Sequence, residues 1–193
     1  ITNTGFEIEL YYAATDRLTL SGNFSYTETE YGEDYFVFTV DDPINPVPVF
    51  GTFTQGFVSA QVTDPSQASD YTVNLKGGPL KGIPEEKATI RVSYEQDTRF
   101  GPLYYLLSHS YTGDFSASGI QRPLDRIDSR ETTNLNISWY SQDGNLSLRA
   151  YVDNLFDNDN YYALSTGDHE TNYRKSVTAL PPRVMGLDIR YRF

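Results

Sequence analysis

The last twelve residues, PRVMGLDIRYRF (Pro182 to Phe193), alternate between two kinds of side chain. The apolar row consists of Met185, Leu187, Ile189, Tyr191 and Phe193, and the positions between them are Gly186, Asp188, Arg190 and Arg192. A period of two places successive side chains on opposite faces of a β-strand. This stretch therefore predicts a strand with one apolar face and one charged face.

The same alternation recurs in six further stretches, and no segment keeps helical spacing over two turns. The stretches are Phe6–Tyr12, Leu18–Tyr26, Ala88–Tyr94, Leu103–Tyr111, Leu135–Trp139 and Leu146–Val152. In the fourth of these, Leu106 falls on the otherwise polar side. We therefore expect an all-β protein built from seven antiparallel strands.

The connections between these strands alternate between short and long. The short ones are centred on Thr15–Arg17, Asp97–Pro102 and Gln142–Asn145, and the long ones run over Gly32–Pro84, Asp114–Ser129 and Phe156–Leu180. A compact soluble domain rarely contains three long loops without structure of their own. Outer-membrane barrels combine short periplasmic turns with long extracellular loops. The pattern therefore favours an antiparallel transmembrane β-barrel.

Composition narrows the function. The chain has 193 residues, 26 acidic and 15 basic side chains and a formal net charge of −11, which argues against nucleic acid as a partner. It has no cysteine and two histidines, so neither a thiolate site nor a multi-histidine metal site is expected. Sixteen tyrosines and eleven phenylalanines suit a water–lipid interface. No catalytic motif is present, and the sequence implies no enzyme activity, cofactor or metal.

Several short motifs occur in an order that resembles TonB-dependent outer-membrane receptors. The most specific is Asn154-Leu155-Phe156-Asp157 followed by Tyr161, which is similar to the family's "NLFD…Y" motif. The others are Gly5–Glu9, Asp16–Leu20, Ile83-Pro84, Tyr111–Asp114 and Pro181-Pro182-Arg183. A terminal aromatic strand, here ending in Tyr191 and Phe193, resembles the signal that the barrel-assembly machinery recognises in outer-membrane proteins.

The resemblance implies a barrel of about 22 strands with a plug domain inside. Seven strands are too few to close a membrane barrel, which needs about eight and in bacteria an even number. We therefore expect residues 1–193 to be the C-terminal part of the receptor barrel, without the plug domain and the earlier strands. The implied location is the outer membrane of a Gram-negative cell, with strands in contact with its lipid bilayer.

The implied function is active uptake of a scarce solute, with a ferric siderophore as the family's usual cargo and cobalamin, haem or a saccharide as others. The implied partners are the receptor's own plug domain, the TonB complex and the barrel-assembly machinery. Two alternatives stay open: a passive outer-membrane channel, and a soluble carbohydrate-binding β-sandwich, whose strands also alternate.

The candidate ligand-binding residues lie in the long connections. Tyr35, Phe36 and Phe53 belong to an aromatic-rich loop that either forms an extracellular hairpin or presents its rings to a ligand. His169, between Asp168 and Glu170, is a candidate ligand residue in the last loop.

Asn154 and Asp157 are expected to cap a strand and fix the turn into the last loop, because Asx side chains bond nearby backbone groups. A cation site formed by Asp153, Asp157 and Asp159 is the alternative, although it lacks the spacing and the glycine of an EF-hand. The charged residues opposite the apolar rows are expected to face the barrel lumen: Glu7, Glu9, Arg91, Glu95, Arg149, Asp153, Asp188, Arg190 and Arg192.

Overall fold

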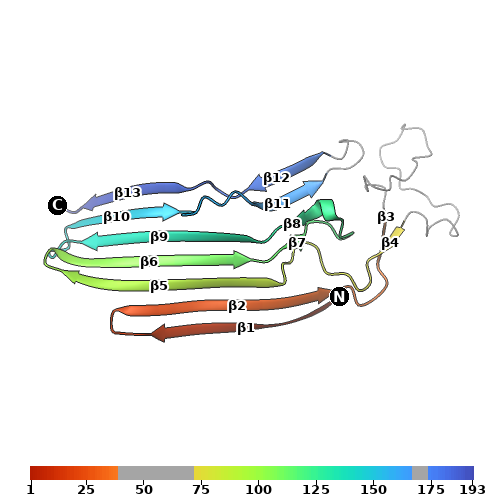
Figure 1. Ribbon diagram of the computed structural model, residues 1–193, viewed down its shortest axis with the longest axis horizontal. Coiled ribbons are helices and arrows are strands. Elements are labelled where there is room, and N and C mark those ends of the chain that lie inside the picture. Colours follow the sequence, from red (N-terminus) through yellow and green to blue (C-terminus); the bar gives the residue numbers. More distant parts are fainter. Residues whose placement is uncertain (39–71, 167–173) are drawn as a thin grey trace.

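The computed structural model describes residues 1–38, 72–166 and 174–193, and its main feature is one antiparallel sheet of seven strands (Figure 1). Its strands are β1 (Thr2–Ala13), β2 (Leu18–Glu30), β5 (Glu86–Thr98), β6 (Gly101–Thr112), β9 (Arg130–Tyr140), β10 (Leu146–Asp153) and β13 (Val184–Tyr191). They lie side by side in the order β1-β2-β5-β6-β9-β10-β13, which is their order along the chain. The seven expected strands are confirmed.

Three tight hairpins join the strands at one end of the sheet. The second hairpin is tighter than the expected Asp97–Pro102, because pairing continues to Thr98 and Gly101 and leaves only two residues in the turn. Gly101 has a φ of +122° and lies against the neighbouring strand, where an added Cβ would be 1.9 Å from the carbonyl oxygen of Tyr140. Only glycine accepts this combination of backbone angle and close approach.

The three long connections lie at the opposite end (Figure 1). Each contains a two-stranded sheet: β3 (Phe36–Phe38) with β4 (Thr72–Asn74), β7 (Phe115–Ser116) with β8 (Arg126–Ile127), and β11 (Tyr161–Thr166) with β12 (Lys175–Ala179). A short 3-10 turn, Pro123–Asp125, lies within the second connection. The β3–β4 pair agrees with the first of the two alternatives for the first long loop, a hairpin. The described parts of all three connections therefore contain paired strands of their own.

The seven-stranded sheet keeps large apolar side chains on its surface. Ile189 is 66% exposed, and Ile8, Leu10, Met185 and Leu187 are similarly open. Among the described residues, the buried apolar side chains are Leu75 and Ile127, and both belong to the loop end rather than to the sheet. A sandwich would bury these rows against a second sheet. The described part of the sheet instead leaves these rows exposed.

The apolar rows form a band that slants across the strands. Leu10 in β1 pairs with Gly22 in β2, which pairs with Ile90 in β5, which pairs with His109 in β6. Ile189 in β13 pairs with Leu148 in β10, which pairs with Trp139 in β9, which pairs with Leu103 in β6.

Leu10 in β1 and Ile189 in β13 are therefore level with two residues of β6, His109 and Leu103, that lie six positions apart. This displacement is about 20 Å along the strand over a sheet width of about 29 Å. For Leu10 and Ile189 to lie at one depth of a membrane, the strands must tilt by about 35°, which is within the range of membrane barrels.

Candidate functional site

The residues of the Asn154–Asp157 motif form a clamp at the loop end of β10. Asn154 has a φ of +52° and is only 5% exposed. Its side-chain oxygen accepts a hydrogen bond from the backbone N–H of Asn158 at 2.9 Å, and its amide nitrogen donates to the carbonyl oxygens of Asn158 and Pro181, both at 2.9 Å. One buried side chain thus joins the end of β10 to the segment that enters β13.

Asp157 completes the clamp on the β13 side. It has a φ of +56°, and its carboxylate accepts the backbone N–H of Arg183 at 2.8 Å. On the β9 side, the backbone N–H of Asn154 donates to the Asn134 side chain at 2.9 Å, and that of Leu155 to the Thr133 carbonyl at 2.7 Å. The clamp therefore joins the end of β10 and the segment that enters β13 to β9.

The aromatic members of the sequence motifs lie on the surface. Phe156 is 75% exposed, and Tyr161, the first residue of β11, is half-exposed. At the other end of the sheet, Tyr191 and Phe193 are exposed, and their rings meet edge to face with centroids 5.1 Å apart. These aromatic side chains are open to contact with other molecules.

A buried ion pair holds the loop end together, and no sequence motif indicated it. Arg122 Nε lies 2.5 Å from Asp125 Oδ2, and these side chains are 9% and 1% exposed. The other carboxylate oxygen of Asp125 accepts the hydroxyl of Thr166 in β11 at 2.8 Å. The ammonium of Lys175 in β12 donates to the Leu124 carbonyl. The Asp114–Ser129 connection is therefore fixed to the β11–β12 hairpin.

The aromatic candidate residues are only partly within the described structure. Tyr35 is half-exposed and stacks on Tyr31, with ring centroids 5.4 Å apart and an interplanar angle of 17°. Phe36 begins β3, opposite Asn74. Phe53 and His169 lie outside the described residues. The described residues therefore place Tyr35 beside Tyr31 and leave the expected ligand-binding role of all four candidates as a prediction.

Asp34 anchors the base of the same loop. Hydrogen bonds from Asn74 and Lys76 hold the pKa of Asp34 below its ordinary value. The Lys76 ammonium lies 3.2 Å from the Asp34 carboxylate, and the backbone N–H of Tyr35 donates to Asn74 Oδ1 at 3.1 Å. The two ends of the aromatic-rich loop are thus joined by polar contacts.

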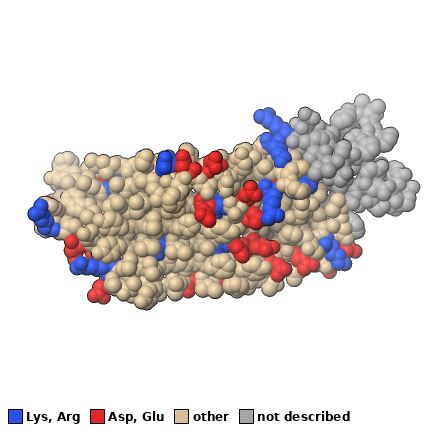
Figure 2. Space-filling view, in the orientation of Figure 1, with Lys and Arg blue, Asp and Glu red and all other residues tan. Residues whose placement is uncertain are grey.

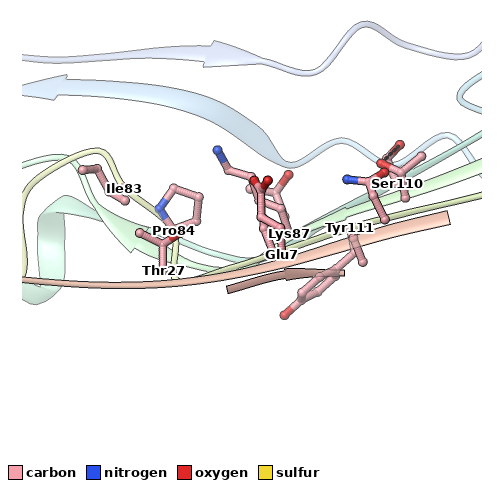
Figure 3. Close-up of a pocket in the computed structure, with 12 residues that line it drawn as sticks. Glu7, Thr27, Ile83, Pro84, Lys87, Ser110 and Tyr111 are labelled. Atoms are coloured by element: carbon pink, nitrogen blue, oxygen red, sulfur yellow. Dashed lines mark hydrogen bonds between the residues drawn. The ribbon is translucent and has the colours of Figure 1, made fainter. Parts of the chain in front are cut away.

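The face of the sheet opposite the apolar band is polar, and it has a hollow of about 400 Å³ near the loop end (Figure 3). Two cross-strand rows of polar residues line it: Glu7, Ser25, Lys87 and Thr112 in one row, and Asn23, Thr89 and Ser110 in the other. Glu7 and Lys87 point to the same side of the sheet, whereas Tyr111 points to the other side.

Nearer the hairpins, the polar face has an organised charged cluster. Both the Nε and Nη2 atoms of Arg149 donate to the Asn136 side-chain oxygen, at 3.1 and 2.7 Å. Its Nη1 atom lies 3.7 Å from a carboxylate oxygen of Asp188. Side chains from β9, β10 and β13 therefore meet on the face where the sequence placed the charges.

Acidic and basic side chains lie at both ends of the face seen in Figure 2, more of them toward the loop end, with a broad area of other residues between the two groups. Within the described ranges there is no group of three or more carboxylate or imidazole side chains that could hold a metal ion. Nor does this part of the chain contain a helix long and apolar enough to cross a membrane.

An antiparallel sheet with a slanted apolar band, a polar opposite face, tight turns at one end and long loops at the other defines a segment of an outer-membrane β-barrel wall. Residues 1–155 match the model of the family described as TonB dependent receptor-like, beta-barrel, and the chain belongs to this family. It is therefore a protein of the outer membrane of Gram-negative cells. The alternative interpretation of the sequence as a soluble β-sandwich is wrong.

Solved receptors share the fold. The ferric yersiniabactin uptake receptor of Yersinia pestis aligns with a TM-score of 0.68 and 18% identity, over 99% of this chain and 23% of its own. The siderophore receptor PiuA of Acinetobacter baumannii aligns with a TM-score of 0.66 and 13% identity, over 98% of this chain and 21% of its own. The ferric citrate transporter FecA aligns with a TM-score of 0.60 and 15% identity, over 99% of this chain and 24% of its own.

The chain thus spans less than a quarter of the length of the first two receptors and about a quarter of the third. A search of curated proteins gave no match. The family and these neighbours are transport receptors and not enzymes.

Proposed function

We propose that this chain forms part of the wall and extracellular loops of a receptor that takes up a scarce solute with energy supplied through the TonB complex. The observation that carries the proposal is the match of residues 1–155 to the receptor-barrel family. The polar inner face and the ordered loop end support it, because a solute needs both a wetted path and a shaped entrance.

A ferric siderophore is the first candidate solute. Two of the similar structures are described as a ferric yersiniabactin uptake receptor and a ferric citrate transporter. Cobalamin, haem and saccharides are the other solute classes that the proposal includes. The loop residues Tyr35, Phe36, Phe53 and His169 are proposed to contact the solute.

The proposed partners follow from the two faces and the two ends of the sheet. The polar face would contact the receptor's own plug domain, through which the TonB complex acts, and the apolar band would contact the lipid bilayer. The exposed Tyr191 and Phe193 would be read by the barrel-assembly machinery. In this proposal residues 1–193 form the C-terminal part of the barrel, and the plug domain belongs to another part of the protein.

Uptake of radiolabelled ferric siderophore by iron-starved cells tests the proposal. The strains to compare carry the full-length receptor with and without a functional TonB complex. We expect uptake only in the strain that has a functional TonB complex beside the receptor. Equal uptake in the strain without TonB would support the passive-channel alternative and contradict energised transport.

A further inference from the structure

His109 interrupts the apolar row of β6, on the face of the sheet opposite the polar one. The other members of this row are Leu103, Tyr105, Leu107 and Tyr111. Tyr111 points away from the side that carries Glu7 and Lys87 (Figure 3), and the period of two places His109 on the same side as Tyr111. An ionisable side chain on a lipid-facing surface is costly, so it marks a candidate functional site.

One ring nitrogen of His109 has a partner within the sheet. Its Nδ1 atom lies 2.8 Å from the hydroxyl oxygen of Thr133, the residue that pairs with it in β9. Thr133 is 6% exposed, so this contact fixes the ring from its buried side. Among the described residues the other nitrogen, Nε2, has no hydrogen-bond partner and is not a buried atom. Nε2 is therefore free to bind a molecule outside the sheet.

The position of His109 in the sheet limits what that molecule can be. β6 is the fourth of the seven strands, and its two neighbours, β5 and β9, both belong to this chain. Further barrel strands would pair at the outer edges of β1 and β13, and the plug domain would contact the polar face. The lipid bilayer, the proposed partner of the apolar band, is therefore what meets Nε2.

The register gives the depth of His109 in that bilayer. The plane through Leu10 and Ile189 crosses β6 near Leu106, because β6 lies three strands from each edge of the sheet. At about 3.4 Å per residue and a tilt of about 35°, His109 lies about 8 Å from this plane on the loop side. The apolar band of such barrels is about 25 Å tall, so His109 lies inside it and roughly 4 Å from its extracellular boundary. Tyr111, two residues further, lies at that boundary, where tyrosine is common.

This depth is close to where the acyl chains of a lipid join its headgroup. A neutral imidazole presents Nε2 as an acceptor in one tautomer and as a donor in the other. An amide-linked acyl chain that carries a hydroxyl group has both donors and acceptors at its head and can serve either tautomer. The ester groups of a glycerophospholipid only accept. The imidazole therefore favours a lipid with amide-linked, hydroxylated chains.

We propose that His109 and Thr133 form a site on the outer wall of the barrel for an outer-leaflet lipid with amide-linked, hydroxylated acyl chains. His109 Nε2 bonds the amide or hydroxyl group at the head of one chain, and Thr133 positions the ring. The exposed side chains of Ile90, which pairs with His109, and Leu107 contact the chain itself. The inference rests on the proposed contact between the apolar band and lipid, and it specifies the lipid.

Native mass spectrometry of the purified full-length receptor, mixed with lipid A in detergent, tests the site. We expect lipid A to bind about fivefold more weakly to His109→Leu, as the loss of one hydrogen bond predicts. His109→Gln keeps a donor and an acceptor and should recover most of the affinity. Leu103→Val is the matched control, because Leu103 lies on the same face of β6 but nearer the hairpins, and its affinity should equal that of wild type. Heat-modifiability in gel electrophoresis shows that each variant is folded.

Phosphatidylethanolamine, mixed with the same proteins, compares the two lipid classes. We expect it to bind wild type and His109→Leu equally. Three results would overturn the site: equal binding of lipid A to wild type and His109→Leu, no binding of lipid A to either, or an equally large loss of phosphatidylethanolamine. Membrane assembly of an Ile189→Arg receptor and the TonB dependence of uptake are measured separately. Loss of this site therefore leaves the proposed lipid contact and transport function standing.

Discussion

The ring of Tyr151 in β10 lies across Gly186 in β13. The two residues face each other in the strand register, and a Cβ added to Gly186 would lie 2.3 Å from both Cζ and Oη of the tyrosine. The guanidinium of Arg149 lies 5.1 Å from the centre of the same ring. A tyrosine that covers a glycine on the neighbouring strand fixes the register of the pair, because a shift by one residue would place the ring against a side chain.

Replacing this glycine tests the arrangement. We expect Gly186→Val to destabilise the folded barrel by about 1–3 kcal/mol, because the ring has to leave its position. The measurement is the temperature at which the full-length receptor loses its compact, heat-modifiable form in gel electrophoresis. Tyr151→Ala in the same chain should recover part of the loss, and a purely additive double variant would contradict the packing relationship.

Asn154 should be the most sensitive residue of the clamp. We expect Asn154→Ala to cost about 2–3 kcal/mol, because it removes the three hydrogen bonds of a buried side chain, to Asn158 and Pro181. Asn154→Gly keeps the backbone angle and removes the side chain, so it separates strain from hydrogen bonding. Urea denaturation of the receptor in lipid vesicles measures the effect. Similar stability of the glycine variant and wild type would show that the side-chain bonds contribute little.

The apolar band predicts that an arginine is tolerated on the polar face of the sheet but not on the apolar face. Ile189→Arg should prevent most of the receptor from reaching the outer membrane in folded form, since an arginine facing the middle of the bilayer costs about 2–4 kcal/mol. Thr19→Arg places the same side chain on the polar face of β2 and should leave assembly nearly unchanged. Fractionation and heat-modifiability report the outcome. Normal assembly of the Ile189 variant would contradict a lipid-facing position.

The buried ion pair predicts that the extracellular loops depend on Asp125. Asp125→Ala should make the loop end open to proteases, because it leaves the buried Arg122 without this carboxylate partner and frees the Thr166 hydroxyl. Asp114→Ala removes the exposed pair with Arg126 and should change little. Trypsin digestion of intact cells, followed by detection of the fragments, compares the two variants. Equal cleavage rates would argue against a structural role for the buried pair.

Asp143 gives a pH-dependent prediction for the last hairpin turn. Hydrogen bonds from the Ser141 side chain and the Asn145 backbone hold the pKa of Asp143 below its ordinary value of 3.8. The folded state therefore favours the charged form, so this stabilisation is present above pH 3.8 and is lost as the pH falls through the lowered pKa. Asp143→Asn should be less stable than wild type at neutral pH and approach it in acid. A difference that does not change with pH would contradict this.

The strands were predictable from local pattern. Met185 to Phe193 and the other alternating stretches need only their own residues to mark two faces, because the period of two is a property of the strand itself. The same holds for the short hairpins, where glycine and polar residues interrupt the alternation. The outer-membrane class then followed from the order of short and long connections.

The sites were less predictable, because their partners are distant in the sequence. The motif showed that Asn154 belongs to a turn, but its bond to Pro181 crosses 27 positions. The pairing of Asp125 with Thr166 crosses 41 positions and leaves no local signal. Leu106, an exception to the alternation, still lies in β6 between Ser93 and Asn136 of the neighbouring strands.

Residue order alone therefore established which segments become strands, which face of each strand is apolar, and the family to which the chain belongs. The slant of the apolar band, the clamp at Asn154, the loop ion pair and the polar hollow arise only when the strands take their register. Their physical basis is hydrogen bonding and packing between residues from different strands, and these contacts depend on the register of one strand against the next.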